Sequence, residues 1–119
     1  FKIQPKDTPL SICSSSSTMG HSISFGNCDL VTVFSKSGTL ADATATLACN
    51  MVKTQADMAP VMDKIMRISG ILGIMLIKDD RIGMDGDVPE LIRNADPKMI
   101  GKVTRDKNSN FRYLKTNLR

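Results

Sequence analysis

Residues 30–51 read LVTVFSKSGTLADATATLACNM and contain a change from strand to helix. The run Leu30–Phe34 is rich in β-branched and aromatic residues, which is typical of a strand. Ser37-Gly38-Thr39 then breaks the strand pattern. Beyond it, apolar residues recur at helical spacing, namely Leu40, Ala43, Leu47, Ala48 and Met51. We therefore expect a helix at about residues 40–53.

The segments on either side extend this pattern into an α+β fold. Downstream we expect a second helix, with Asp57 as N-cap, Pro60 in its first turn and Gly70 at its end. An apolar strand at 71–77 and a turn at Asp79-Asp80 then lead into a hairpin strand at 81–84, and a short helix is expected near 89–94.

Upstream, residues 1–10 read as an extended lead-in. A strand is expected to start near Ser11, and Ile23–Phe25 is expected to pair with Leu30–Phe34 across Gly26-Asn27. Together these expected elements predict a mainly antiparallel sheet that is covered on one face by two helices.

Composition indicates one soluble domain spanning residues 1–119. Of its 119 residues, 41% are hydrophobic and 24% are charged, as in ordinary globular proteins. No apolar run approaches the roughly 20 residues that a membrane-spanning helix needs, so we expect no membrane partner.

Cys13, Cys28 and Cys49 are odd in number and widely spaced, which favours free thiols and a cytoplasmic location. Because the chain begins at Phe1, we expect it to be a processed or truncated piece.

Residues 98–119 form a basic tail with a net charge of +6, which leaves −2 for the rest of the chain. Its basic residues are Lys98, Lys102, Arg105, Lys107, Arg112, Lys115 and Arg119, opposed only by Asp106. Such a tail can contact nucleic acid or an acidic partner. A solvated terminal segment, or one that contacts another part of the protein, is the commoner explanation, so we do not expect a nucleic-acid partner.

Asp42 and Thr46 are candidate metal ligands. They are one turn apart on the same face of the expected helix, and Cys49 and Asn50 continue that face. A carboxylate and a hydroxyl, completed by water, backbone carbonyls and substrate phosphates, suit Mg²⁺. Spacing alone favours a different role, in which Thr39 is the N-cap and Asp42 completes a capping box without any metal.

Residues 14–18 supply five consecutive hydroxyls, Ser14 to Ser17 and Thr18, and lead to His21. Hydroxyls and exposed amides can bind phosphate, but a serine-rich edge strand or loop that makes local hydrogen bonds is the commoner explanation of such a run. His21, the only histidine, can orient a phosphate or act as a general base, or it can be structural.

Cys13 is the candidate nucleophile if a neighbour lowers the pKa of its thiol, while a buried, inert thiol is the simpler interpretation. Five acidic residues, Asp79, Asp80, Asp85, Asp87 and Glu90, lack the spacing of a calcium loop and are explained as turn residues.

The segments that carry these candidates resemble the ApbE-like superfamily, whose best-known members are FAD:protein FMN transferases. Leu40-Ala41-Asp42-Ala43-Thr44-Ala45-Thr46 after the strand is similar to the Ala-Asp-Ala-x-x-Thr-Ala helix of that superfamily. The stretch 12–26, ICSSSSTMGHSISFG, is similar to an uncharacterised branch with a Cys-(Thr/Ser)-Ser-Ser-Gly-Thr-x-Gly-His-Ser-x-Ser-Phe-Gly run, with Ser17 in place of its glycine.

The resemblance covers about residues 11–87 and implies a flavin-binding, T-fold-like half-domain. It implies Asp42 and Thr46 as Mg²⁺ ligands, with Ser16, Ser17, Thr18 and His21 at the site of FAD or another phosphorylated ligand. The transferases follow their histidine with Asp-Pro and Thr-Gly, whereas His21 is followed by Ser22-Ile23-Ser24-Phe25-Gly26, which argues against FMN transfer itself.

Superfamily members are about twice as long as this chain. The resemblance therefore implies a C-terminal half that needs an N-terminal half of the same protein, or a homo-oligomer, to complete its cleft. The uncharacterised branch has been linked to sulfur assimilation into homocysteine, which implies a second hypothesis, a thiol-dependent enzyme using Cys13. A third hypothesis is a non-catalytic interaction or structural subunit.

Overall fold

The computed structural model describes residues 1–17 and 26–93 and has the expected α+β architecture. After a 3₁₀ turn at Pro5–Asp7, its elements are β1 (Ser11–Ser15), β2 (Leu30–Ser35), α1 (Gly38–Met51), a 3₁₀ turn at Gln55–Asp57, α2 (Met58–Met66), β3 (Ile71–Lys78) and β4 (Arg81–Gly86).

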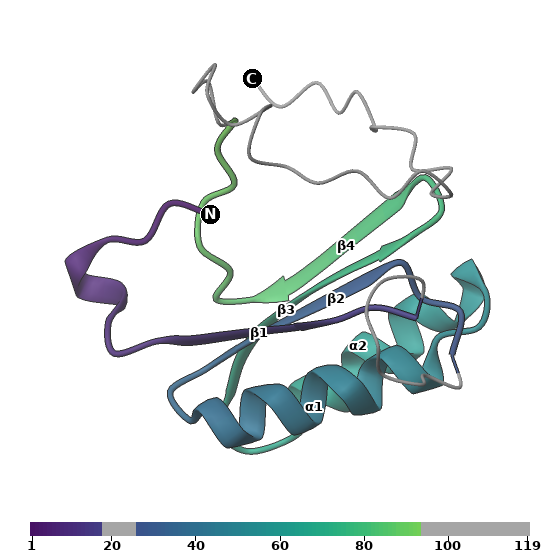
Figure 1. The fold of residues 1–119 in the computed structure, drawn as a ribbon, viewed down its shortest axis with the longest axis horizontal. Helices are drawn as coiled ribbons and strands as arrows, with labels where there is room; N and C mark the ends of the chain where they lie inside the picture. The colour runs from purple at the N-terminus through teal and green to yellow at the C-terminus, as the bar shows by residue number, and fades with distance from the viewer. Residues whose placement is uncertain (18–25, 94–119) are drawn as a thin grey trace.

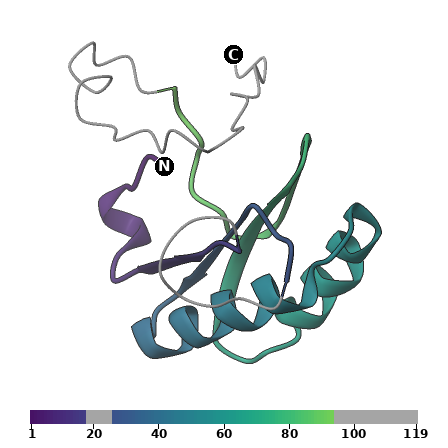
Figure 2. The same ribbon diagram turned by 45° about the vertical axis from the view of Figure 1, so that its right-hand side comes forward.

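The four strands form one sheet in the order β1-β2-β3-β4, and every neighbouring pair is antiparallel. Both helices lie in the connection between β2 and β3, so they cover the same face of the sheet (Figures 1 and 2). The N-terminal segment lies on the opposite side, where Lys2 forms an isolated antiparallel bridge with Glu90. The two central strands, β2 and β3, are thus enclosed and the two outer strands are edges.

Strand alternation explains how β2 is buried on both faces. Val31 and Val33 point to the helices and belong to the main hydrophobic cluster, together with Ile74 and Leu76 of β3. Phe34 points the other way, where the ring of Phe1 packs edge-on against it with centroids 5.1 Å apart. Segments on both sides therefore exclude water from this strand, and a buried apolar run is the sequence signal of such a strand.

The helices pack closely because small or flexible side chains face the sheet. Ala41, Ala45 and Ala48 of α1 are at most 1% exposed. α2 contributes Met62, whose sulfur occupies the space where a Cβ at Gly83 would lie, 2.6 Å away. Methionine adapts to irregular gaps, which suits a core that contains no tryptophan.

The element boundaries correct several expectations. α1 begins at Gly38 instead of residue 40 and ends at Met51. α2 begins at Met58 with Asp57 in the N-cap position and Pro60 in its first turn, as expected, but it ends at Met66, before Gly70. The Asp57 carboxylate does not cap α2, because it accepts hydrogen bonds from the backbone N–H groups of Lys53 and Thr54 at 3.0 and 2.9 Å and so stabilises the preceding turn.

The short helix expected near 89–94 is wrong for the residues that the structure describes. No helix forms over 89–93, because Glu90 accepts a backbone hydrogen bond from Lys2 at 2.8 Å and Asp87 donates one to Leu72 at 2.8 Å. The expected strand at 23–25 and the basic tail at 98–119 lie outside the described residues.

Candidate functional site

Asp42 and Thr46 lie on the exposed side of α1, while Ala41, Thr44, Ala45 and Ala48 are buried. The Thr46 hydroxyl donates to the backbone carbonyl of Asp42 at 3.2 Å. Within the described part of the chain, the Asp42 carboxylate makes no hydrogen bond or ion pair. The pair thus offers an uncommitted carboxylate and the lone pairs of a hydroxyl whose proton is already donated.

The alternative role for this aspartate, a capping box with Thr39, is wrong. Ser37 is the N-cap of α1, and its hydroxyl accepts from the N–H of Leu40 at 3.3 Å. Thr39 is inside the helix, and Asp42 is beyond the positions that a capping box uses. The first turn of α1 is therefore stabilised without the Asp42 side chain.

The hydroxyl run is divided between the sheet and the end of α1. Ser14, in β1, shares a 2.8 Å hydrogen bond with Thr32 of β2. Ser17 lies 32 residues before Cys49 in sequence, but its hydroxyl oxygen is 3.2 Å from the Cys49 sulfur. The same oxygen accepts from the N–H of Cys28 at 3.1 Å. The run thus has the local hydrogen bonds that its composition predicts, but it also reaches the C-terminal end of α1.

Two of the predicted site residues, Thr18 and His21, lie outside the residues that the structure describes. The other candidates of the hydroxyl run, Ser16 and Ser17, are part-buried. Asp42, Thr46 and Cys49 follow one side of α1 at spacings of four and seven residues, and Ser17 contacts the last of them. These three residues of α1 and Ser17 at its C-terminal end thus form one strip, whereas Cys13 lies outside it in β1.

Cys13 is a partly exposed residue of β1 that packs against the hydrophobic cluster. Its thiol donates to the carbonyl of Gly38 at 3.7 Å. Cys13 therefore packs beside the start of α1.

Cys28 and Cys49 form a contact that their spacing in the sequence did not indicate. Both are 0% exposed. Burial raises the pKa of the Cys28 thiol to about 12, and the neighbouring Cys49 thiol, which is hydrogen-bonded to it, adds to the increase. The Cys28 thiol donates to the carbonyl of Ile77 at 3.4 Å. At neutral pH the Cys28 thiol is therefore protonated.

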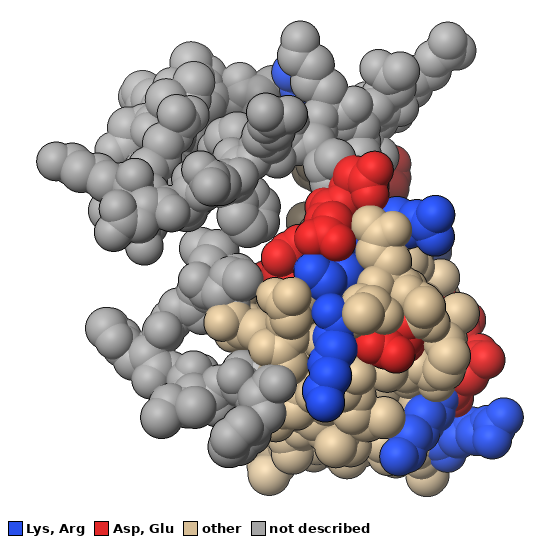
Figure 3. All heavy atoms as spheres, turned by 90° about the vertical axis from the view of Figure 1, so that its right-hand side faces the viewer, with Lys and Arg blue, Asp and Glu red and all other residues tan. Residues whose placement is uncertain are grey.

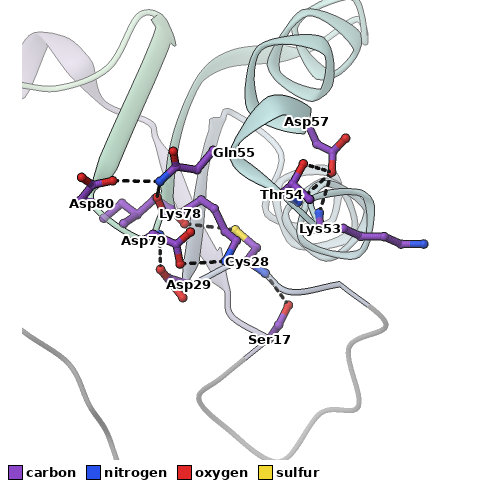
Figure 4. Close-up of polar contacts among 11 residues, drawn as sticks. Ser17, Cys28, Asp29, Lys53, Thr54, Gln55, Asp57, Lys78, Asp79 and Asp80 are labelled. Atoms are coloured by element: carbon purple, nitrogen blue, oxygen red, sulfur yellow. Dashed lines mark hydrogen bonds and ion pairs between the residues drawn. The ribbon is translucent and has the colours of Figure 1, made fainter.

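Charged side chains meet at the β3–β4 turn (Figure 4). Asp79 has a left-handed φ of 53°, as the Asp79-Asp80 turn predicts. Its N–H donates to the Asp29 carboxylate at 2.6 Å, and its own carboxylate pairs with the Lys78 ammonium at 2.9 Å. Gln55 donates to the Asp80 carboxylate at 2.9 Å. These contacts fasten the hairpin to the helix layer and leave its carboxylates engaged.

Among the described residues, no helix has the length and apolar composition of a membrane span. The same residues contain no group of three or more His, Cys, Asp or Glu side chains that could hold a metal ion. A cation at Asp42 would therefore need backbone, water or ligand oxygens as well.

Acidic and basic side chains are interspersed on the side of the molecule that Figure 3 faces.

Comparison with known proteins places the chain in a family. A family model described as AbpE bacteria matches residues 1–69. A UPF0280 protein of Methanocaldococcus jannaschii is 38% identical over 95 residues, which are 77% of this chain and 39% of that protein. A UPF0280 protein of Methanospirillum hungatei is 44% identical over 98 residues, which are 82% of this chain and 38% of that protein. The matches thus span about 40% of the length of these relatives. The chain belongs to the AbpE bacteria family and is a relative of the UPF0280 proteins.

Proposed function

We propose that the outer face of α1 binds Mg²⁺ through Asp42 and Thr46, and with it a flavin nucleotide or another ligand that carries phosphate groups. The observation that carries this proposal is the uncommitted Asp42 carboxylate, one helical turn from a hydroxyl on an exposed face. Mg²⁺ prefers oxygen ligands and usually keeps water or substrate phosphate in part of its coordination shell. Two protein ligands, one from Asp42 and one from Thr46, are therefore sufficient to hold Mg²⁺ when water and ligand phosphate complete its coordination shell.

The capping of α1 supports a ligand role for Asp42. Because the Ser37 hydroxyl accepts from Leu40, the helix start does not require the aspartate. Because its carboxylate is exposed and has no partner among residues 1–17 and 26–93, it is available to bind a cation.

The position of Ser17 supports an elongated ligand. Asp42 and Cys49 are seven residues apart, which is about 10 Å along a helix. Ser17 contacts Cys49 and therefore lies at the far end of the same strip. A dinucleotide such as FAD carries phosphates and hydroxyl-binding edges over at least that distance, so the metal pair and the hydroxyl run suit two parts of one ligand.

The proposal covers ligand binding and does not include FMN transfer. His21 is followed by Ser22-Ile23-Ser24-Phe25-Gly26, without the Asp-Pro and Thr-Gly sequence of the transferases that this chain resembles. Because the matches span about 40% of the relatives' length, we propose that other parts of the protein or a second copy complete the ligand site. The thiol-dependent hypothesis, which uses Cys13, stays a prediction.

Thermal melting with FAD, in the presence and absence of Mg²⁺, tests the proposal. FAD should raise the melting temperature only when Mg²⁺ is present, because a ligand that binds the native state stabilises it. Asp42→Ala should abolish this increase. Asp63→Ala, which removes an exposed carboxylate of α2, is the matched control and should keep it. If FAD with Mg²⁺ shifts neither the unaltered protein nor the control, the proposal fails.

A further inference from the structure

We propose that Cys28 and Cys49 are a disulfide-forming pair that closes in response to a small-molecule disulfide. The two cysteines come from different elements, one from the segment that enters β2 and one from the last turn of α1. Their thiols are hydrogen-bonded neighbours. The cross-link would tie the entry of β2 to the C-terminal end of α1.

Backbone packing supports the short separation between the two segments. A Cβ at Gly26 would lie 1.9 Å from the carbonyl oxygen of Cys49 and 3.0 Å from the Cα of Asn50, so only glycine allows this approach. The N–H of Asn27 donates to the carbonyl of Val52 at 2.8 Å. The chain is thus held against the end of α1 immediately before Cys28.

Ser17 links the pair to the hydroxyl run. Its hydroxyl oxygen is 3.1 Å from the Cys28 nitrogen and 3.2 Å from the Cys49 sulfur. Converting the Cys49 thiol to a disulfide moves its sulfur toward Cys28 and leaves the sulfur able only to accept a hydrogen bond, which changes its contact with the Ser17 hydroxyl. The redox state of the pair would thus alter the surroundings of a residue proposed to lie beside the ligand.

The reaction follows thiol–disulfide exchange. The Cys49 thiolate attacks one sulfur of the small disulfide and releases one small thiolate. The Cys28 thiolate then attacks the Cys49 sulfur of the mixed disulfide and releases the second. The two protons lost by the cysteines are taken up by the two released thiolates, and the protein loses the two electrons that the small disulfide gains. The raised pKa of Cys28 assigns it the second attack.

The burial of both thiols determines how fast the Cys28–Cys49 cross-link is expected to form. Cys28 and Cys49 are 0% exposed, whereas Cys13 is partly exposed, so an oxidant reaches the pair only when the local packing opens. The cross-link should therefore form slowly, and low concentrations of urea should accelerate it.

The test exposes the intact chain to oxidised glutathione, then blocks the remaining thiols by alkylation and maps the peptides by mass spectrometry. We expect a Cys28–Cys49 cross-link that dithiothreitol reverses, and a higher melting temperature for the oxidised form. The proposal is overturned if Cys28 and Cys49 remain alkylatable while Cys13 is glutathionylated, or if the cross-link involves Cys13.

Two variants sharpen this test. Cys28→Ser should leave glutathione attached to Cys49, because no second thiol can resolve the mixed disulfide; Cys28→Ala replaces it if the serine variant does not fold. Cys13→Ser is the matched control and should leave the cross-link unchanged. The absence of any glutathione adduct at Cys49 in a folded Cys28 variant would contradict the assigned order of attack.

Discussion

The two ends of one strip on α1 differ in how fully their side chains are engaged. At its C-terminal end, Cys49 is buried beneath Ser17, Gly26 and Cys28. Near its N-terminal end, Asp42 is exposed and its carboxylate has no partner among the described residues. The crowded end should determine stability, and the open end should be free to bind a ligand. Substitutions at the C-terminal end should therefore lower the free energy of unfolding, whereas substitutions at Asp42 should reduce ligand binding and leave stability nearly unchanged.

The largest effect is expected at Gly26. In Gly26→Ala the new methyl group would collide with the backbone carbonyl of Cys49, which cannot move without distorting α1. We expect a loss of about 3 kcal/mol of unfolding free energy, measured by urea denaturation. Gly38→Ala is the control, because its Cβ would only touch the Ser11 hydroxyl at 3.5 Å. Equal effects of the two substitutions would contradict the close packing at this end.

A smaller effect is expected at Ser17. Ser17→Ala removes an acceptor for the Cys28 N–H and one of the partners of the Cys49 thiol. Leaving a part-buried donor without a partner should cost about 1–2 kcal/mol in urea denaturation. Ser14→Ala, which removes a shared hydrogen bond with Thr32 on the other face, provides a comparison at the far side of the sheet. A Ser17 variant as stable as the unaltered protein would show that this contact does not support the fold.

Asp57 allows an engaged carboxylate to be compared with Asp42. Hydrogen bonds from the backbone N–H groups of Thr54 and Lys53 lower the pKa of Asp57 below its ordinary value of 3.8. A lowered pKa in the folded state means that the charged form stabilises the protein. This stabilisation is complete above the ordinary pKa and is lost as the pH falls from there through the folded-state pKa.

We therefore expect Asp57→Asn to reduce the stability measured at pH 7 and to weaken its dependence on pH below 4. Urea denaturation over a pH series measures both. Parallel stability curves for the variant and the unaltered protein would show that Asp57 does not contribute in this way.

The smallest effect on stability is expected at Asp42. Asp42→Asn removes no described hydrogen bond or ion pair, so the free energy of unfolding should change by no more than about 0.5 kcal/mol. A larger loss would mean that the carboxylate has a structural role, and would weaken the comparison between the two ends.

The local sequence pattern was sufficient to predict most of the fold and the placement of two candidate site residues on one helix. The junction of β2 and α1 and the β3–β4 hairpin were predicted from periodicity and turn residues, because their signals come from neighbouring residues. The spacing of Asp42 and Thr46 correctly placed them on one face of α1. The N-cap was misassigned, because Ser37 and Thr39 are both good capping residues and pattern alone does not choose between them.

The features that sequence did not reveal depend on distant segments. Glu90 forms a β-bridge with Lys2, so the described residues near 89–94 do not form the helix expected there. Cys28 and Cys49 meet only because α1 runs back along β2 and brings its last turn beside the start of that strand. No local pattern encodes such contacts.

Binding of Mn²⁺ as a substitute for Mg²⁺ most directly tests the role of the open end. Electron paramagnetic resonance distinguishes free from bound Mn²⁺, so a titration in the presence of FAD measures the number of ions bound per chain. The unaltered protein and Asp63→Ala should bind one Mn²⁺ per chain, and Asp42→Ala should bind none at the same concentrations. Equal Mn²⁺ binding by Asp42→Ala and the unaltered protein would contradict the assignment of Asp42 as a metal ligand.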